Sequence, residues 1–448
     1  MKKQMKISYI FIAAVGYFLS ADAKTTAVFP DSNIPQALAE LLPGDTLLLN
    51  PGIYHVSPSE IARKTDIGPY AIVYDLSMSG EKGNPIVIKG MGDESGNRPV
   101  FDFSDVTLRD ESNPDGYRIT GFLISGSYIH ISDLECVGLK VTRTDHTQSE
   151  NFRIKGGAYN TLENISCHDG MGIGVYINGD SHHNLIVNCD AYNNYDPVSD
   201  ISPRTGEGSG GNNDGFGCHV KGDMDGNIII GCRAWRNTDD GFDLINCYSP
   251  VEISYCLTME NGYDAEGNNR ADGNGVKGGG FGMKPRNIPL NGGQSPRHVI
   301  SNNVAIGNKA NGLYSNHHLG GIDFISNTGI DNGNSNYSTV NRRGPEKGSN
   351  VDVNGYGHTL TENLSLSTKG KHTVWIKDAP SDAEVMCVDT EIIPKLRQIY
   401  ARRMSNGMLA PETIEAVNNC RRESRGADFS KYPDAIERAK RITGADAE

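Results

Sequence analysis

Ile228-Ile-Ile-Gly-Cys232 is followed five residues later by Asn237, and Ile253-Ser-Tyr-Cys256 is followed in the same way by Asn261. The two segments align with a step of 24 residues between the two cysteines. Short runs of β-branched residues that end at a fixed small or polar position are typical of strands followed by turns. The constant step predicts that successive strands occupy equivalent places in a repeating structure.

Other segments follow the same pattern of alternating apolar residues, a Cys or Asn, and an Asn five places later. They are Leu185-Ile-Val-Asn-Cys189 with Asn194, Val299-Ile-Ser-Asn-Asn303 with Asn308, Phe324-Ile-Ser-Asn327 with Asn332, a degenerate copy at Asn363, and earlier copies centred on Asp133 and Asn164. The steps from 164 to 189 and from 303 to 327 are 25 and 24 residues, whereas those from 189 to 232 and from 256 to 303 are 43 and 47. The long steps predict insertions into single repeats.

A repeat in the low twenties with Asn and Gly at its corners predicts an all-β fold, the parallel β-helix. Its coils stack at roughly 4.8 Å, so that side chains at one position form columns. Buried Asn columns satisfy the backbone groups of the corners, and we expect Cys at equivalent places to fill the column without hydrogen bonds. An all-β sandwich is the alternative, but it does not explain the fixed step.

The chain divides into three predicted parts. Residues 1–23 resemble a signal peptide, with three lysines, an apolar stretch from Ile7 to Ser20 and an Ala21-Asp22-Ala23 cleavage site. The solenoid is expected over 24–380, with a cap helix at Ile34 to Leu41. Residues 381–448 lose the repeat, and helix-like patterns at 391–404, 411–421 and 434–442 predict a helical appendage packed on the solenoid. We therefore expect an exported protein, located in the periplasm, on the cell surface or in the medium.

The bulk composition limits the partners of the protein. The formal net charge is −13, which disfavours general attraction to nucleic acid or to an anionic membrane. We expect a monomer with no membrane span in the mature chain. The nine cysteines are odd in number and recur inside apolar runs, so most are predicted to be small buried residues rather than disulfides.

A second pattern places acidic residues next to the core. Asn213-Asp-Gly-Phe-Gly217, Asp239-Asp-Gly-Phe-Asp243, Gly273-Asn-Gly-Val-Lys277 and Ala310-Asn-Gly-Leu-Tyr314 each follow one copy of the repeat. If Phe216, Phe242, Val276 and Leu313 point inward, the flanking residues form two outward columns. One column contains Asp214, Asp240, Asn274 and Asn311, and the other contains Gly217, Asp243, Lys277 and Tyr314.

These columns predict a metal site. Asp214, Asp239, Asp240 and Asp243 repel one another unless a cation lies between them, and hard oxygen ligands in irregular geometry suit Ca²⁺. Zinc is a poor fit, because no Cys/His set has suitable spacing. The alternative is that these residues only make turns, as Asp-Gly often does.

Lys277 is predicted to lie one coil from Asp243 and therefore beside the cation. The alternative is a solvated surface lysine. The long insertions, residues 195–212 and 263–272, enter just before this patch and are expected to wall a cleft. Arg270 or Arg286 nearby, together with the cation, would lower the pKa of Lys277, as a general base requires.

A polyuronate fits this arrangement chemically, because the proton at C5 next to its carboxylate becomes acidic when a cation binds that carboxylate. The stretch from Asn213 to Lys277 resembles polysaccharide lyase family 9, which contains pectate and rhamnogalacturonan lyases with a right-handed parallel β-helix. The resemblance covers roughly residues 120–370. It implies that Asp214, Asp239, Asp240 and Asp243 are calcium ligands and that Lys277 is the Brønsted base in β-elimination.

Tyr314-Ser-Asn-His-His318 followed by Gly320-Gly321 is most similar to the gut-Bacteroides branch of that family, several members of which act on the rhamnogalacturonan I backbone. We expect an acidic pectic substrate, with Arg270, Arg286, Tyr314, Asn316, His317 and His318 as its candidate contacts. The two histidines are equally interpretable as turn residues. Pectate lyase activity on homogalacturonan is the first alternative function, and a non-catalytic carbohydrate-binding β-helix is the second. A β-helical polygalacturonase is excluded, because Arg153-Ile-Lys155 precedes the Asp pair and Gly-His-Gly is absent.

Overall fold

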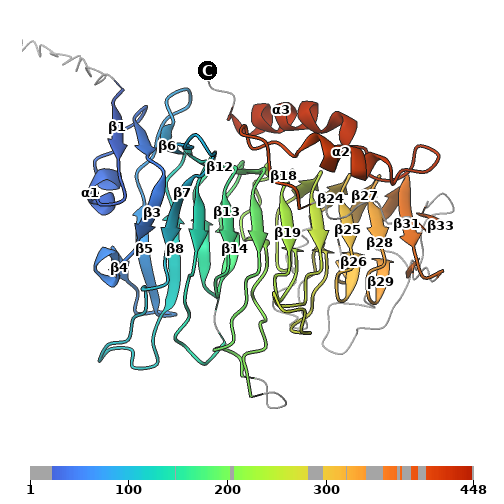
Figure 1. Cartoon of the computed structure of the whole chain (residues 1–448), viewed down its shortest axis with the longest axis horizontal. Helices are drawn as coiled ribbons and strands as arrows, with labels where there is room; N and C mark the ends of the chain where they lie inside the picture. The colour runs from blue at the N-terminus through green and yellow to red at the C-terminus, as the bar shows by residue number, and fades with distance from the viewer. Residues whose placement is uncertain are drawn as a thin grey trace, which may run out of the picture.

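A computed structural model of the chain shows three sheets wound around one long axis (Figure 1). It describes residues 23–146, 148–201, 206–280, 296–318, 320–339, 357–370, 374–375, 385–391 and 400–445. Each sheet contains 11 strands, and from β5 to β32 the chain visits the three sheets in turn, so each coil there contributes one strand to each sheet. The pairs are parallel, apart from the antiparallel pair at the N-terminal edge of the third sheet.

Neighbouring strands within a sheet come from successive coils. Sheet A contains β1 (Thr25–Val28), β2 (Thr46–Leu49), β6 (Ile86–Gly90), β9 (Ile129–Ser132), β12 (Thr161–Glu163), β15 (Leu185–Val187), β18 (Asn227–Ile230), β21 (Val251–Ser254), β24 (His298–Ser301), β27 (Ile322–Ile325) and β30 (Thr359–Thr361). Sheet B contains β3 (Gly52–His55), β7 (Pro99–Asp102), β10 (Glu135–Val137), β13 (Ser166–His168), β16 (Asp190–Tyr192), β19 (Arg233–Trp235), β22 (Leu257–Met259), β25 (Val304–Ile306), β28 (Thr328–Ile330), β31 (Asn363–Ser367) and β33 (Val385–Asp389). Sheet C contains β4 (Arg63–Lys64), β5 (Tyr70–Leu76), β8 (Arg118–Ile124), β11 (Glu150–Lys155), β14 (Ile173–Gly179), β17 (Phe216–Val220), β20 (Phe242–Asp243), β23 (Val276–Lys277), β26 (Asn311–Tyr314), β29 (Ser335–Ser338) and β32 (Val374–Trp375).

The predicted parallel β-helix is therefore confirmed, but its C-terminal boundary is further along the chain than expected. β33 pairs in parallel with β31 and extends sheet B to Asp389, beyond the predicted limit at residue 380. This last strand carries none of the Asn signals that mark the other coils, so the pattern ends before the structure does. Residues 1–22, which include nearly all of the predicted signal peptide, lie outside the described residues.

The core of the solenoid is a set of columns that run along the axis. Phe216, Phe242, Val276 and Leu313 are register partners in turn on sheet C, and each is at most 1% exposed. The predicted inward register of the Gly-aromatic elements is confirmed. The rings of Phe216 and Phe242 stack with centroids 5.1 Å apart, which fills the core between two coils.

Buried Asn ladders link the corners of successive coils, as predicted. Asn194 donates to Asn237, Asn237 to Asn261 and Asn261 to Asn308, with Nδ2–Oδ1 distances of 2.9, 3.1 and 3.0 Å. A second ladder runs from Asn303 through Asn327 to Asn363. Each amide also bonds a backbone carbonyl of the preceding coil, and this satisfies polar groups that would otherwise be buried without partners.

The prediction that cysteines fill the Asn column without hydrogen bonds is wrong. Cys256 Sγ donates to the carbonyl of Ile229 at 3.7 Å, just as Asn303 Nδ2 donates to the carbonyl of Ile253 at 2.9 Å one coil later. The thiol is a weak donor that serves the same corner carbonyl. All nine cysteines are free thiols, and Cys387 is the exposed one.

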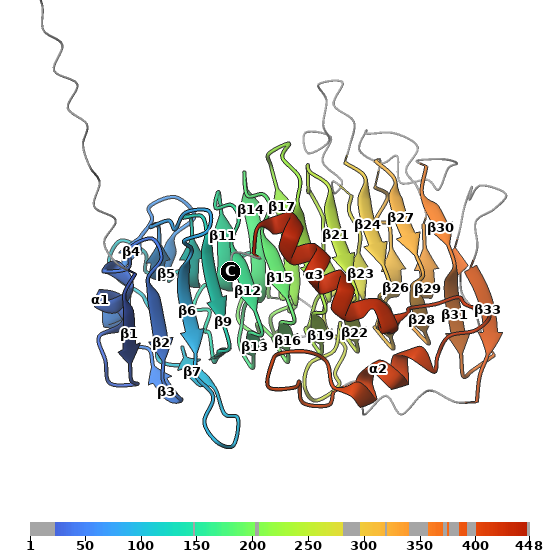
Figure 2. The same ribbon diagram turned by 90° about the horizontal axis from the view of Figure 1, so that it is seen from above.

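Helices cover one end and part of the outer surface. α1 (Ile34–Ala39) lies at the N-terminal end and is capped by the side chain of Asn33. α2 (Pro411–Asn418), the 3₁₀ turn at Phe429–Lys431 and α3 (Tyr432–Thr443) pack on the outer faces of sheets A and B, and α3 crosses β15 and β18 (Figure 2). Within the described part of the chain, no helix is long and apolar enough to span a membrane.

Buried ion pairs fasten the C-terminal segment to the solenoid. Asp190 on β16 accepts from Arg233 on the next coil at 2.7 Å and from Arg403 of the C-terminal segment at 2.7 Å, and the three side chains are at most 8% exposed. Burial alone would raise the pKa of Asp190, but the charges of Arg233 and Arg403 outweigh it and hold the pKa well below its usual range. Lys440 on α3 pairs with Glu163 at 3.0 Å.

Phe242→Ala removes a ring that is fully buried against Phe216. We expect the free energy of unfolding to fall by about 3–5 kcal/mol, because the residual cavity adds to the lost transfer energy. Urea unfolding followed by circular dichroism measures this. A melting temperature within a degree of the wild type would contradict the inward register.

Asp190→Asn leaves two buried guanidinium groups without their shared carboxylate, and should cost about 3–5 kcal/mol at neutral pH. Asp169→Asn, which alters an exposed carboxylate on a neighbouring coil, is the control and should change stability by less than about 1 kcal/mol.

The loss of stability caused by Asp190→Asn should become smaller as the pH falls. Because the folded pKa of Asp190 is depressed, its contribution is complete above the ordinary Asp pKa of about 4 and declines as the pH falls below it. Urea unfolding of both chains at a series of pH values measures the difference. A deficit that grows on acidification would refute the assigned ion pair.

Candidate active site

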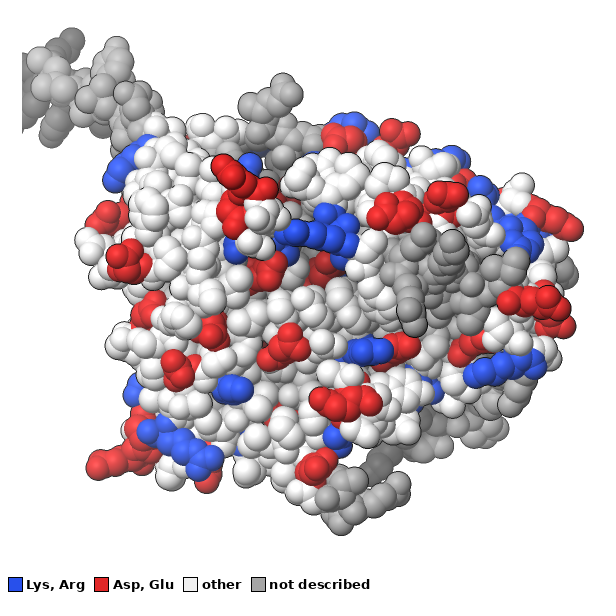
Figure 3. Space-filling view, in the orientation of Figure 1, with Lys and Arg blue, Asp and Glu red and all other residues white. Residues whose placement is uncertain are grey.

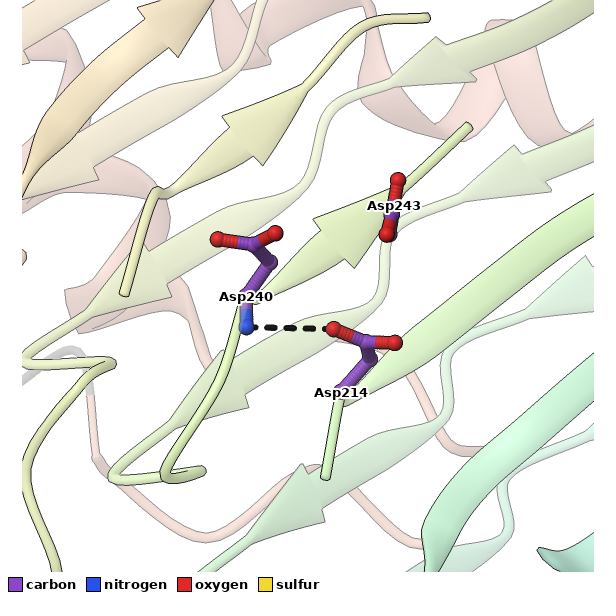
Figure 4. Close-up of side chains that lie close together, drawn as sticks. All are labelled: Asp214, Asp240 and Asp243. Atoms are coloured by element: carbon purple, nitrogen blue, oxygen red, sulfur yellow. Dashed lines mark hydrogen bonds between the residues drawn. The ribbon is translucent and has the colours of Figure 1, made fainter. Parts of the chain in front are cut away.

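Three carboxylates converge where the segments before β17 and β20 meet sheet C. Asp214, Asp240 and Asp243 each offer one oxygen atom, and these three atoms all lie within 4.8 Å of one another (Figure 4). Asp214 precedes β17, Asp240 precedes β20 and Asp243 lies on β20. The parallel register pairs Gly217 with Asp243 and Asp243 with Lys277, so the predicted column that contains these three residues forms as expected.

Each of the three carboxylates is held by backbone N–H groups through one oxygen. Asp214 Oδ1 accepts from the N–H of Asp240 at 3.1 Å, and Asp243 Oδ1 accepts from the N–H of Ile245 at 2.7 Å. Asp240 Oδ1 accepts from both the backbone and the side-chain amide of Asn274, at 2.6 and 2.7 Å. One oxygen of each carboxylate is thus fixed in position by a backbone donor.

Lys277 contacts that centre directly. Its Nζ lies 2.9 Å from Asp240 Oδ2 and 3.2 Å from Asp243 Oδ2, and its side chain is 12% exposed. The alternative of a solvated surface lysine is thereby excluded. Although Asp240 Oδ2 lies near the ammonium group, it accepts no well-aligned hydrogen bond from the described residues.

Asp239 occupies a different position from the other three acids. Its Oδ2 accepts from the backbone N–H of Asn212 at 2.8 Å, and its Oδ1 accepts from that of Asp272 at 3.2 Å. Asp239 therefore anchors both insertions, and it lies outside the compact group of three. Its assignment as a fourth calcium ligand stays a prediction.

The acidic column is buried, and in this respect the expectation of an outward-facing surface is wrong. Asp214, Asp240 and Asn274 are 3%, 0% and 3% exposed. Asn311 continues the column, because its Nδ2 donates to Asn274 Oδ1 at 2.8 Å. The two insertions are tied to this side of the coils through Asp239, which accepts from the backbone N–H groups of Asn212 and Asp272.

Burial and like charges disfavour ionised carboxylates at this site. Burial, followed by the charges of Asp239 and Asp243, raises the pKa of Asp214 well above its usual range. Burial also raises the pKa of Asp243 to about 6, despite the charge of Lys277. Burial and the charge of Asp240 raise the pKa of Asp239 to about 7. A bound cation would favour the ionised forms.

The carboxylates around Lys277 raise its pKa, and the predicted lowering, which depends on a bound cation, stays a prediction. Burial lowers the pKa, but the surrounding carboxylates, with Asp240 and Asp243 foremost, outweigh burial and hold it well above the usual lysine range. The expected arginine does not oppose this effect. Arg270 pairs with Asp264 and with Glu207, both at 2.8 Å, and stacks over Tyr195 at 4.4 Å, so it joins the two insertions to each other. Arg286 lies outside the described residues.

The predicted substrate-binding residues at the end of β26 and in the turn after it differ in exposure. Tyr314 is the register partner of Lys277, and Asn316 and His317 are partly exposed in the turn that follows it. His318 is 0% exposed, accepts from the N–H of Gly280 at 3.1 Å, and lies with Nε2 at 2.6 Å from the carbonyl of Pro296. Burial lowers the pKa of His318 to about 4. For His318 the structure favours the turn-residue alternative over contact with a saccharide.

Sequence reasoning missed His219 on β17. Its Nδ1 lies 3.2 Å from the hydroxyl of Tyr176, and its Nε2 lies 3.9 Å from Asp243 Oδ2. Burial, with the charge of Lys277 second, lowers the pKa of His219 to about 3, so the ring is neutral. The alternation in Phe216-Gly-Cys-His-Val220 places Gly217 and His219 on one face, and that signal could have identified it.

The three carboxylates fit a calcium ion on the chemistry of their donors. They supply hard oxygen atoms with a formal charge of −3, already oriented by backbone N–H groups, and Asp240 Oδ2 is a buried acceptor that lacks a well-aligned donor. Among the described residues, this is the one compact group of three or more His, Cys, Asp or Glu ligand atoms.

Comparison with known proteins identifies the family. Residues 14–373 match the model of the Pel9A-like, right-handed β-helix region. Pectate lyase L of Dickeya chrysanthemi is 32% identical over 359 residues, which span 78% of this chain and 68% of that relative. Among solved structures, a rhamnogalacturonan lyase has a TM-score of 0.77 at 35% identity and covers 90% of this chain and 100% of its own. The pectate lyase Pel9A has a TM-score of 0.62 at 26% identity, with 87% and 88% covered.

The chain belongs to the Pel9A-like right-handed β-helix family, and the resemblance to polysaccharide lyase family 9 is confirmed. These relatives support polysaccharide lyase activity in general. Placement in the gut-Bacteroides branch stays a prediction.

Asp240→Ala should weaken Ca²⁺ binding at least tenfold, about 1.4 kcal/mol, because it removes an anionic ligand that is already oriented. Isothermal titration calorimetry of the purified protein measures this without any substrate. Asp272→Asn is the matched control, since Asp272 is exposed and lies outside the group of three. Equal Ca²⁺ affinities for Asp240→Ala and the wild type would remove the metal site.

Proposed function

We propose that the protein is an exported pectin-degrading lyase that cleaves the rhamnogalacturonan I backbone at galacturonate, by calcium-assisted β-elimination with Lys277 as the base. The observation that carries the proposal is the contact of Lys277 Nζ with Asp240 and Asp243 inside a cluster of buried carboxylates. The 35% identical rhamnogalacturonan lyase supports this choice of substrate.

The residues have distinct roles in this mechanism. Asp214, Asp240 and Asp243 would hold the ion, with Asp239 as a predicted fourth ligand. Bound Ca²⁺ would offset the charge of these carboxylates and increase the acidity of the uronate C5 proton. Lys277, in its neutral form, takes that proton. The C5–H electron pair then forms the C4–C5 double bond while the C4–O bond breaks, and the departing oxygen takes up a proton from water or from a donor such as His317.

Two alternative functions differ in whether they require the lysine and the cation. Homogalacturonan needs the same lysine and cation, and the 32% identical pectate lyase L supports it as the alternative substrate. A non-catalytic carbohydrate-binding β-helix does not need a lysine in register with Asp243, and the observed pairing of the two residues argues against it.

Lys277→Ala should lower kcat by at least 10²–10⁴-fold, the usual contribution of a general base. Lys277→Arg should be almost as inactive, because a guanidinium group stays protonated at any usable pH. Ultraviolet absorbance of the unsaturated product measures the rate, with EDTA as a control for the ion. Near-normal kcat in Lys277→Ala on both pectic backbones, with folding intact, would refute the mechanism.

The substrate is decided by comparing initial rates on debranched rhamnogalacturonan I and on homogalacturonan at matched galacturonate concentration. We expect kcat/KM to be at least tenfold higher on rhamnogalacturonan I. A preference for homogalacturonan would assign the chain to the pectate lyases instead, and loss of both activities on removal of calcium would still support the common mechanism.

A further inference from the structure

The side chains on the outer face of sheet B change along the solenoid axis, from polar and aromatic in the earlier coils to apolar in the later ones. In its C-terminal half the outward columns are apolar, as at Leu257, Met259 and Val304, and the C-terminal segment with α2 packs against them. In the preceding coils the same columns contain polar and aromatic side chains. Tyr192 and Trp235 are register partners there, and they lie immediately before Met259 in one column.

A cavity lies over these coils. Its volume is 850 Å³, and binding sites for small ligands commonly enclose about 300–1,000 Å³. The loop of residues 91–98 forms one wall, and the start of the C-terminal segment, residues 400–405, forms the other. Arg402 connects the two walls by donating to the carbonyls of Ser95, at 3.2 Å, and Gly96. On the face seen in Figure 3, basic and acidic side chains gather side by side in this region.

Two polar groups that line the cavity, on Tyr192 and Trp235, are available to bind a ligand. The rings of His168, Tyr192 and Trp235 stack with centroids 4.4 and 4.2 Å apart along the outer face of sheet B. Within the described residues, neither the Tyr192 hydroxyl nor the Trp235 indole N–H makes a hydrogen bond, although both side chains are partly buried and line the cavity. Tyr and Trp side chains with an apolar ring and an accessible polar group are enriched where proteins bind partners.

The charges of the lining balance, because its five basic side chains are matched in number by five acidic ones: Lys89, Arg98, Arg233, Arg402 and Arg403 against Asp93, Glu94, Asp133, Glu135 and Asp190. Arg233 and Arg403 hold Asp190, and Arg98 holds Glu135 at 2.9 Å. The lining therefore has no net positive charge to attract a uronate. Its aromatic rings and its hydroxyl and indole groups suit the C–H faces and hydroxyl groups of an uncharged sugar, since hydroxyls both donate and accept hydrogen bonds.

We propose that this cavity is a second, non-catalytic site that binds a short neutral saccharide on a face of the solenoid other than sheet C. Such a site would retain the neutral branches of a polysaccharide while the buried acidic cluster acts on its acidic backbone. Its existence does not depend on the reaction at Lys277.

Intrinsic fluorescence tests the proposal, because the chain contains two tryptophans and one of them, Trp235, lines the cavity. A chain carrying Trp375→Phe is titrated with galactotetraose, with arabinotetraose and, in EDTA, with tetragalacturonate. We expect a saturable change with at least one neutral tetrasaccharide, and tetragalacturonate should bind at least tenfold more weakly. The Lys277→Ala chain should bind the neutral sugar unchanged, which separates this proposal from the proposed activity.

Tyr192→Phe keeps the ring stack and removes the unused hydroxyl, so it should weaken binding roughly three- to tenfold, the value of one hydrogen bond. Tyr128→Phe is the matched control, because Tyr128 is also a stacked, partly exposed tyrosine but lies on another part of the surface. Equal melting temperatures verify that both variants fold. Absence of saturable binding by either neutral sugar, equal affinity for tetragalacturonate, or equal effects of the two tyrosine variants would overturn the proposal.

Discussion

The amide-to-amide hydrogen bond between successive coils is the interaction on which the rest of the structure depends. In the ladder from Asn194 to Asn332, each side chain spans one coil spacing and fixes the corner of its neighbour. The acidic site uses the same kind of link. Asn274 donates both its backbone N–H and its Nδ2 to one oxygen of Asp240, as Asn237 does to Asn261, although the direction along the axis is reversed. The candidate metal site is thus a corner ladder in which carboxylates replace amides.

This origin explains how acids of like charge can be held so close together. One oxygen of each carboxylate accepts from a backbone donor, which fixes the side chain within a rigid stack. Burial and mutual repulsion raise the pKa of Asp214 and Asp243, and stacking of the coils offsets this cost. Preorganisation of this type means that little rearrangement is needed when a cation or a substrate carboxylate arrives.

Local patterns predicted the features that repeat from coil to coil, and they failed for features that depend on contacts between distant segments. The alternation around Phe242 and Val276 was sufficient to place Asp243 beside Lys277. Only one register of the two parallel strands keeps both apolar side chains in the core, and that register pairs Asp243 with Lys277. The position of Arg270 could not be predicted in this way, because its partner Glu207 lies on another insertion. The conformation of an insertion does not follow the repeat of the coils. The strength with which the carboxylates raise the pKa of Lys277 could not be read from the sequence either, because they act together only in three dimensions. The exposure of His318 could not be judged from a sequence that does not show Pro296 and Gly280 packed against it.

The C-terminal segment gives the solenoid a closure that a stack of coils lacks. Coils contact only their neighbours, so an unfastened stack can fray from either end, one coil at a time. In this chain α3 returns across sheet A, and Lys440 reaches Glu163 across 277 residues of sequence. Contacts this remote in sequence close a long loop of chain and so form slowly, after the coils that they join are in place. Once formed, they make early and late coils lose structure together, so the solenoid gains cooperativity from its last residues.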